Sequence, residues 1–201
     1  MWSIKDFFFL KTVMAVIQYG LPVARIELMD AQLVKAVNAY SKLSLPETPL
    51  LLLEFHGSEA GVAEQAETFG MLAEEEGGTG YEATATLEER NKLWQARHDA
   101  YWAMIQACPG RKGIATDVCV PISRFAEAVT AAEAKATEMN LFAPIVGHAG
   151  DGNFHASIMI DMEDADEVVR AGAFVSWLNE LAISMARTCT GAHGIWPGKR
   201  P

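Results

Sequence analysis

Two histidines flank a turn in residues 148–155, whose sequence is HAGDGNFH. Asp151-Gly152 is a dipeptide typical of tight turns, and apolar runs of strand length stand on both sides of it, so this segment predicts a β-hairpin. The arms of a hairpin lie about 5 Å apart, which can bring His148 and His155 together. Two converging imidazoles can hold a divalent cation, with carboxylate or water in the other positions. The alternative is two unrelated loop histidines beside a turn.

Three further side chains could take part in chemistry. His193 lies in a run of small residues (188–195, TCTGAHGI) and is sterically open, as a base or a ligand must be, unless it is simply a surface histidine after a helix. Arg97, on a predicted aromatic-rich helix, can hold a carboxylate with two hydrogen bonds or form a surface ion pair. Lys112 can steer an anion or be a solvated loop residue.

The composition describes a folded, acidic protein. The chain has 201 residues, of which 50% are hydrophobic and 21% charged, and this excludes disorder as its overall state. Its net charge of −10 would repel a phosphate backbone, so we expect no nucleic-acid partner. The cysteines Cys108, Cys119 and Cys189 form no CxxC pair, which favours a reducing compartment over a disulfide framework. Cys119, within an apolar run, is expected to be a small buried hydrophobe.

The sequence contains no candidate for a transmembrane span. Its most apolar N-terminal segment, residues 7–17, is interrupted by Lys11, whereas a membrane helix needs about 20 apolar residues. The simplest interpretation is an amphipathic helix over residues 3–19 whose apolar face packs on another element.

The remaining elements are predicted from periodicity and from capping residues. Asp30, Ser58 and Ser123 are each expected to cap a helix, because their side-chain oxygens can accept hydrogen bonds from its first backbone amides. The order of helices and strands indicates an α+β fold, an antiparallel sheet with helices packed on one face. No repeat or low-complexity linker divides the segments, so we expect one folded unit. The predicted helices are 3–19, 30–40, 59–76, 87–107, 123–140 and 164–187, and the predicted strands are 25–29, 50–55, 81–86, 113–121, 143–147 and 154–160.

Six blocks, in order along the chain, carry a resemblance to a known family. The blocks are VARIELMD (23–30), LLLEFHGSE (52–59), LWQARHDAYW (93–102), TDVCVPISR (116–124), VGHAGDGNFH (146–155) and TCTGAHGI (188–195). With them, the chain from about residue 19 to residue 200 is similar to the C-terminal cap domain of the FAD-linked 2-hydroxy-acid dehydrogenases. These are vanillyl-alcohol-oxidase-type flavoproteins that include cytochrome-linked D-lactate dehydrogenases and the glycolate oxidase FAD subunit. The resemblance implies a ferredoxin-like cap domain that closes over FAD held by an upstream domain.

The resemblance also implies roles for the residues singled out above. His148 and His155 match the family's metal-binding histidines, with Zn or Mn as the divalent metal. His193 matches the base that takes the proton of the substrate hydroxyl while hydride passes from the α-carbon to the flavin. Arg97 and Lys112 are expected to bind the substrate.

Asn153, within the metal-binding block, is expected to contact the cofactor.

Two positions depart from the family pattern. Ala192 stands where the family has a glutamate that would be the third metal ligand, and two histidines alone hold a metal more weakly. Trp196 replaces a glycine, which adds bulk where a tight turn is expected.

The expected function is that of the substrate- and metal-binding cap portion of an FAD-dependent D-lactate dehydrogenase, which oxidises a D-2-hydroxy acid to a 2-oxo acid. Residues 1–19 are expected to form an atypical apolar helix, and residues 20–201 a cap domain truncated at its C-terminus, without an FAD-binding domain. The alternative is a catalytically inactive remnant that serves as an interaction or metal-binding module.

The expected partners are an FAD-binding domain in cis or in trans, a small 2-hydroxy acid, and an electron acceptor such as cytochrome c or a quinone. On its own the chain is expected to be inactive. The expected location is cytoplasmic, including the periphery of the inner membrane, or mitochondrial in a eukaryote.

Overall fold

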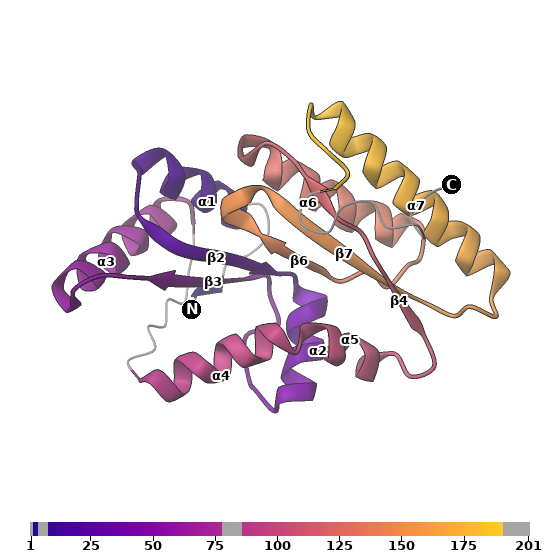
Figure 1. The fold of residues 1–201 in the computed structure, drawn as a ribbon, viewed down its shortest axis with the longest axis horizontal. Helices are drawn as coiled ribbons and strands as arrows, with labels where there is room; N and C mark the ends of the chain where they lie inside the picture. Colours follow the sequence, from indigo (N-terminus) through magenta and orange to yellow (C-terminus); the bar gives the residue numbers. More distant parts are fainter. Residues whose placement is uncertain (1, 4–7, 78–85, 191–201) are drawn as a thin grey trace. The chain divides into compact units, whose positions relative to one another are not determined.

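A computed structural model describes residues 2–3, 8–77 and 86–190 of the chain (Figure 1). The chain divides into two compact units, an N-terminal unit Met1–Pro109 and a C-terminal unit Gly110–Pro201. The single folded unit expected from the sequence is therefore two, and the division falls at the Cys108-Pro109-Gly110 turn.

Among the described residues of the N-terminal unit, three strands form a sheet: β1 (Trp2–Ser3), β2 (Val23–Met29) and β3 (Leu50–Phe55). β3 pairs with β1 on one edge and with β2 on the other, both antiparallel. The predicted strand 50–55 is confirmed, and its apolar run is explained by burial, since Leu50, Leu51 and Leu52 are all in the core.

Five helices accompany this sheet in the part of the unit that the structure describes. Two predicted caps are confirmed: the Asp30 carboxylate accepts a hydrogen bond of 2.7 Å from the Leu33 amide, and Ser58 Oγ accepts one of 3.2 Å from the Gly61 amide. The helices are α1 (Phe8–Tyr19), α2 (Ala31–Ser41), α3 (Glu59–Glu75), α4 (Leu87–His98) and α5 (Ala100–Ala107).

Two sequence predictions for this unit were wrong. The helix expected over 3–19 is described from Phe8 to Tyr19, and Ser3, expected to be helical, pairs with Leu50 of β3 as part of a short strand. The helix expected over 87–107 is interrupted at Asp99, whose ψ of 1° ends α4 and starts α5, and whose carboxylate accepts a hydrogen bond from Gln95. The strand predicted over 81–86 lies almost wholly outside the described residues.

The C-terminal unit is built around one long strand, β7 (Asn153–Ile160). β6 (Ile145–His148) pairs with it along one edge, and β4 (Lys112–Ala115) and β5 (Val118–Cys119) pair with it in succession along the other. All of these pairings are antiparallel, as the α+β prediction required, and β6 and β7 form the predicted hairpin.

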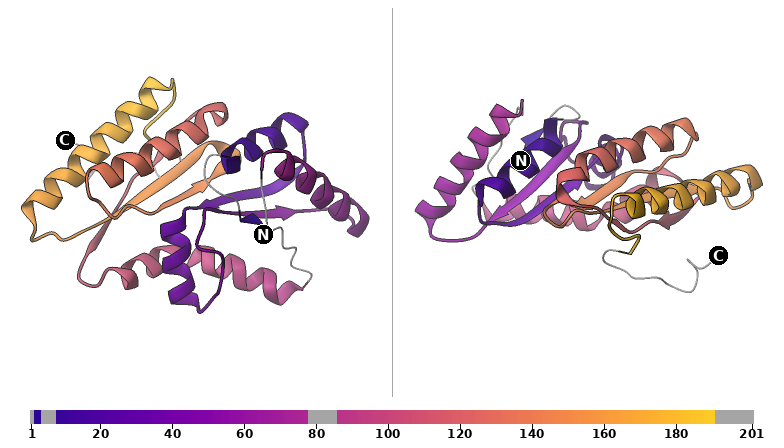
Figure 2. Two further views of the ribbon diagram at one scale, coloured as in Figure 1. Left: turned by 180° about the vertical axis from the view of Figure 1, so that it is seen from behind. Right: turned by 90° about the horizontal axis from the view of Figure 1, so that it is seen from above.

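Two long helices cover one face of these strands (Figures 1 and 2). They are α6 (Ile122–Glu138) and α7 (Ala165–Ser184), and α6 packs on β7 through Phe125 and Phe154, whose ring centres lie 5.9 Å apart. Every residue of β7 is buried. Because side chains alternate along a strand, β7 gives one apolar row to this core and a second, polar row to its opposite face.

The strand predicted over 113–121 is also interrupted. Thr116 and Asp117 separate β4 from β5, although Thr116 keeps contact with β7 through hydrogen bonds with both backbone groups of Ala156. Cys119 is half-buried rather than fully buried, and its thiol lies 3.6 Å from the Asp151 carbonyl oxygen.

The prediction that Ser123 caps α6 was wrong, because Pro121 occupies the N-cap position and Ser123 lies inside the first turn.

An exposed ion pair lies at the start of α6. The Arg124 guanidinium donates two hydrogen bonds to the exposed Glu127 carboxylate, which lowers the pKa of Glu127 and raises that of Arg124.

An ion pair between the half-exposed Arg111 and the buried Glu167 ties the start of β4 to α7. Arg111 donates hydrogen bonds to Glu167 and to the Met159 carbonyl, and the second Glu167 oxygen accepts one of 2.8 Å from the Asp161 amide. The Glu167 side chain is only 6% exposed, so its charge needs these partners. The pair therefore holds the end of β7 against α7.

We predict that Glu167→Gln lowers the free energy of unfolding by about 1–3 kcal/mol, because the buried acceptor loses its charge while keeping its size. Urea unfolding followed by circular dichroism would measure it. Glu163→Gln, at an exposed position of the preceding turn, is the matched control and should leave stability unchanged. Equal stability of the two variants would contradict a stabilising role for the pair.

Candidate functional site

The hairpin brings the two predicted metal-binding histidines together. His148 is paired with Asn153, and His155 with Val146, and directly opposed residues of an antiparallel pair share one face of the sheet. The ring centres of His148 and His155 lie 5.9 Å apart. An imidazole nitrogen lies about 2.0–2.1 Å from a bound zinc ion, so two ring centres on one ion are roughly 5–6 Å apart. The separation is thus compatible with one shared cation.

The connection between the two strands is longer than the tight turn expected from Asp151-Gly152. A 3₁₀ turn over Ala149–Asp151 precedes Gly152, which has a φ of +71°. A Cβ atom at Gly152 would lie 2.2 Å from the Val120 carbonyl oxygen. Glycine is therefore required here both by the left-handed backbone and by the close approach of the segment after β5.

The orientation of His155 is fixed by the residues between β4 and β5. Its Nδ1 lies 2.9 Å from the Thr116 carbonyl oxygen, which can only accept a hydrogen bond, so Nδ1 carries the proton and the lone pair of the neutral ring is on Nε2. The Asp117 carboxylate lies 3.6 Å from the same Nδ1 and is fully buried. A histidine that ligates a metal through one nitrogen typically donates from the other in this way.

Asn153 is held by the same segment. Its side-chain Nδ2 donates a hydrogen bond of 3.1 Å to Asp117 and one of 2.9 Å to the Val118 carbonyl. Both partners are acceptors, which fixes the amide with its nitrogen toward them. Asn153 Oδ1 is buried and accepts no hydrogen bond from any residue that the structure describes. An acceptor buried in this state costs about 1–3 kcal/mol unless a ligand satisfies it.

Sequence reasoning missed three members of this face: Thr116, Asp117 and Ser157. All are buried, and Ser157 follows His155 at the strand period of two. The signal that could have found Thr116 and Asp117 is a polar pair within an otherwise apolar run, because a buried carboxylate needs nearby donors.

Arg97 lies on α4 and is partly buried. It donates a hydrogen bond of 2.9 Å to Glu27 of β2, and the two side chains are only 16% and 8% exposed. The pair is therefore not the surface ion pair that sequence alone allowed. Arg97 Nε is buried without a partner among the described residues, and the substrate-binding role of Arg97 stays a prediction.

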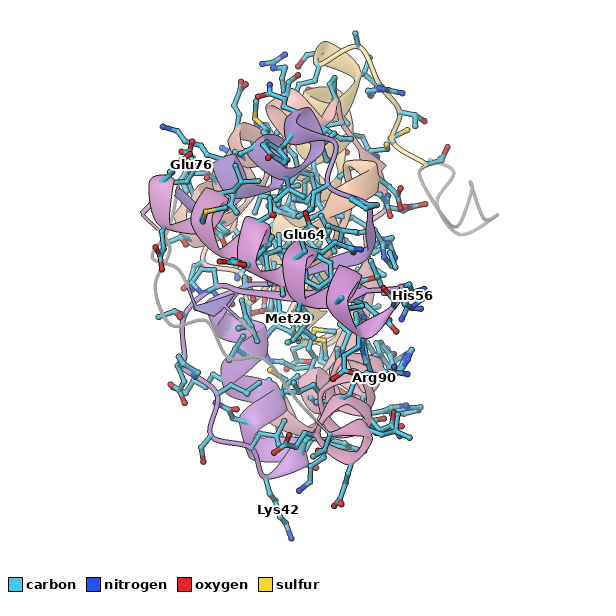
Figure 3. All side chains as sticks on the ribbon, turned by 90° about the vertical axis from the view of Figure 1, so that its left-hand side faces the viewer. Met29, Lys42, His56, Glu64, Glu76 and Arg90 are labelled. Atoms are coloured by element: carbon cyan, nitrogen blue, oxygen red, sulfur yellow. The ribbon has the colours of Figure 1, made fainter. Side chains whose placement is uncertain are left out.

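A second charged cluster lies on β3 of the same unit. Glu54 is within 4 Å of Arg25, Arg90 and His56, so His56 has an acidic neighbour that the sequence did not reveal. Figure 3 shows His56 and Arg90 on the same side of this unit, while Glu64 lies on α3 and Glu76 directly follows this helix. The Arg25 guanidinium stacks 4.7 Å from the centre of the Trp94 ring, a cation–π contact.

The remaining residues singled out in the sequence are Lys112, His193 and Ala192. Lys112 is exposed on β4 opposite Ile160, and its substrate-binding role stays a prediction. His193 and Ala192 lie outside the described residues. Within 2–3, 8–77 and 86–190, no three His, Cys, Asp or Glu side chains form a metal-binding group. None of the helices in the described ranges has the length and apolar character needed to cross a membrane.

Comparison with known proteins assigns the family. The family of FAD linked oxidases, C-terminal domain, matches residues 8–201. The chain therefore belongs to this family, as its sequence blocks indicated.

Two relatives illustrate its place in the family. The chain is 43% identical over 185 residues to the probable mitochondrial D-lactate dehydrogenase of Danio rerio, covering 92% of this chain and 37% of the relative. It is 35% identical to the mitochondrial D-lactate dehydrogenase [cytochrome] of Arabidopsis thaliana, covering 92% and 33%. The chain thus spans about a third of the length of these curated relatives.

Solved structures share the fold at low identity. One is the 4-ethylphenol oxidase from Gulosibacter chungangensis in its isoeugenol complex, with a TM-score of 0.65, 10% identity, and coverage of 96% of this chain and 45% of that one. Another is p-cresol methylhydroxylase with substrate bound, with a TM-score of 0.61, 12% identity, and coverage of 94% and 44%. These similarities support the fold alone.

We predict that Gly152→Ala destabilises the chain by at least about 2 kcal/mol, because it combines a positive φ with a clash against the Val120 carbonyl. Gly150→Ala is the matched control in the same connection, since a Cβ at Gly150 meets nothing within 4 Å. Thermal unfolding of both variants would measure the difference. Similar melting temperatures would show that the hairpin does not depend on this glycine.

Proposed function

We propose that this chain is the substrate- and metal-binding cap portion of an FAD-dependent D-lactate dehydrogenase, which oxidises a D-2-hydroxy acid to a 2-oxo acid. Family membership and 43% identity to a probable D-lactate dehydrogenase support the chemistry. The observation that carries the proposal is the pair His148 and His155, 5.9 Å apart on one sheet face, with His155 oriented through Nδ1 by Thr116.

The proposed roles divide between this chain and its cofactors. Bound FAD supplies an acceptor for the hydride of the substrate α-carbon, and a divalent metal such as Zn or Mn supplies positive charge beside the substrate hydroxyl. His148 and His155 hold that metal, and His193 receives the hydroxyl proton. Arg97 and Lys112 bind the substrate, the guanidinium and the ammonium each offering donors to its carboxylate.

The proposed partners follow from the relatives. An FAD-binding domain, in cis or in trans, supplies the flavin. An acceptor such as cytochrome c or a quinone then takes the electrons, in keeping with the word cytochrome in the name of the Arabidopsis thaliana relative. We also propose a mitochondrial location, because both relatives described above are named mitochondrial.

A second candidate function is an inactive module that binds a metal or a protein partner. Ala192 favours it, because this position lacks the carboxylate that the family uses as a third metal ligand. The two candidates differ in whether the chain supports flavin reduction by a hydroxy acid.

We predict that the chain, mixed anaerobically with FAD, zinc and the FAD-binding portion of the Danio rerio relative, supports bleaching of the flavin by D-lactate. L-lactate should leave the flavin oxidised, since the proposed site distinguishes the two isomers. A mixture prepared with His148→Ala should react at least about tenfold more slowly, because one metal ligand is lost. Absence of bleaching in the complete mixture, with flavin bound, would favour the inactive module.

We further predict that Ala192→Glu raises the affinity for Zn²⁺ by at least about tenfold, because a carboxylate is added to the two imidazoles. Isothermal titration calorimetry with the full chain would measure it. The double variant Ala192→Glu with His155→Ala should lose this gain. An unchanged affinity in Ala192→Glu would count against placing residue 192 beside His148 and His155.

A further inference from the structure

We propose that Asn153 is a metal ligand: its side-chain oxygen completes, with His148 and His155, a three-donor site for a divalent cation. This inference rests on the metal-binding role proposed for the two histidines and extends it to an oxygen donor. It gives the site a third protein ligand within the described residues, independent of residue 192.

The first argument is the fixed direction of the Asn153 amide. Nδ2 is occupied by two acceptors, the Asp117 carboxylate and the Val118 carbonyl. Rotating the amide by 180° would place Oδ1 against both of these oxygens, so the assignment of nitrogen and oxygen is forced. Oδ1 is thereby a buried acceptor that receives no hydrogen bond from the described part of the chain. A bound cation would satisfy it.

The second argument is the position of Asn153 in the strand register. Asn153 lies directly opposite His148, and the Cβ atoms of such a pair are about 4.5–5.5 Å apart. His155 follows Asn153 by two residues on β7, and therefore projects from the same face. The three side chains thus start from neighbouring positions on one face, with the two imidazoles already 5.9 Å apart.

The third argument is that the segment between β4 and β5 orients two of the three donors together. The Asp117 carboxylate accepts a hydrogen bond of 3.1 Å from Asn153 Nδ2, and the Thr116 carbonyl accepts one of 2.9 Å from His155 Nδ1. The remaining polar atom of each side chain, Asn153 Oδ1 and His155 Nε2, is not used in these two bonds. Two adjacent residues therefore fix an oxygen donor and a nitrogen donor on the same face of β7.

The resulting donor set has a definite chemistry. Two imidazoles and an amide oxygen are acceptable ligands for Zn²⁺, Co²⁺ and Mn²⁺, and three protein ligands leave a coordination position open for a substrate oxygen. All three donors are neutral. The bound ion would therefore keep more of its positive charge than with a glutamate ligand, and the Asp117 carboxylate behind Asn153 and His155 would offset part of that charge.

The first test is a titration of the full chain with Co²⁺, followed by its visible absorption. Asn153→Ala should weaken binding by at least about tenfold, whereas Asn153→Asp, which restores an oxygen donor, should bind more tightly than Asn153→Ala. Met159→Leu is the matched control, since Met159 is buried on the same face of β7 four residues after His155, and its affinity should equal that of the unaltered chain.

The second test separates a ligand from a residue that only orients Asp117 and His155. In the unaltered, ¹⁵N-labelled chain, Zn²⁺ should shift the Asn153 side-chain NH₂ signals, which are identified by their loss in Asn153→Ala. The same signals should stay in place when Zn²⁺ is added to His148→Ala. This measurement uses the native residue, so it does not depend on the folding of an Asn153 variant.

Either of two results would overturn the inference. Unshifted NH₂ signals with Zn²⁺ bound, or Co²⁺ affinity unchanged in Asn153→Ala, would remove Asn153 from the ligand set. If His148→Ala and His155→Ala still abolish binding in that case, the proposed two-histidine site stands and only the role of Asn153 fails. Absence of metal binding in the unaltered chain would overturn both.

Discussion

The packing and the hydrogen bonding of the C-terminal unit are set by one constraint: both faces of β7 are buried. Phe154 of this strand packs on Phe125 of α6, while Asn153 and His155 lie on the opposite face, and all three side chains are buried. An apolar face needs only packing, but a buried polar face also needs a hydrogen-bond partner for nearly every donor and acceptor. The polar face is therefore the more demanding of the two, and the neighbouring strands are arranged to satisfy it.

The interruption between β4 and β5 provides hydrogen-bond acceptors for this polar face. A continuous strand would pair its whole backbone with β7 and would leave the buried Asn153 and His155 without acceptors. By leaving the ladder at Thr116 and Asp117, the chain offers a backbone carbonyl to His155 and a carboxylate to Asn153. Asn153 Nδ2 in turn donates a hydrogen bond to the buried Asp117 carboxylate, so the interruption lets these polar groups partner one another inside the protein.

Local signals in the sequence predicted much of the fold, and long-range interactions account for what they missed. The caps at Asp30 and Ser58 were predictable because a capping residue and its amide are three residues apart. The histidine pair was predictable because a hairpin links its arms through a short connection. The break at Thr116 was not, since it depends on Ala156, forty residues away, and the Arg97–Glu27 pair spans seventy.

The hydrogen bonds that hold Asn153 and His155 also favour ligand binding. Asn153 and His155 are each held on one side by Thr116, Asp117 or Val118, all within the C-terminal unit, so folding has already restricted their rotamers. A ligand that meets oriented donors loses less conformational entropy on binding than one that must order them. In the metal site that we propose, two imidazoles and an amide arranged in this way would supply part of the affinity that a carboxylate at residue 192 would add. Preorganisation by Thr116, Asp117 and Val118 is thus the physical argument for metal binding by the hairpin in a chain whose residue 192 is alanine.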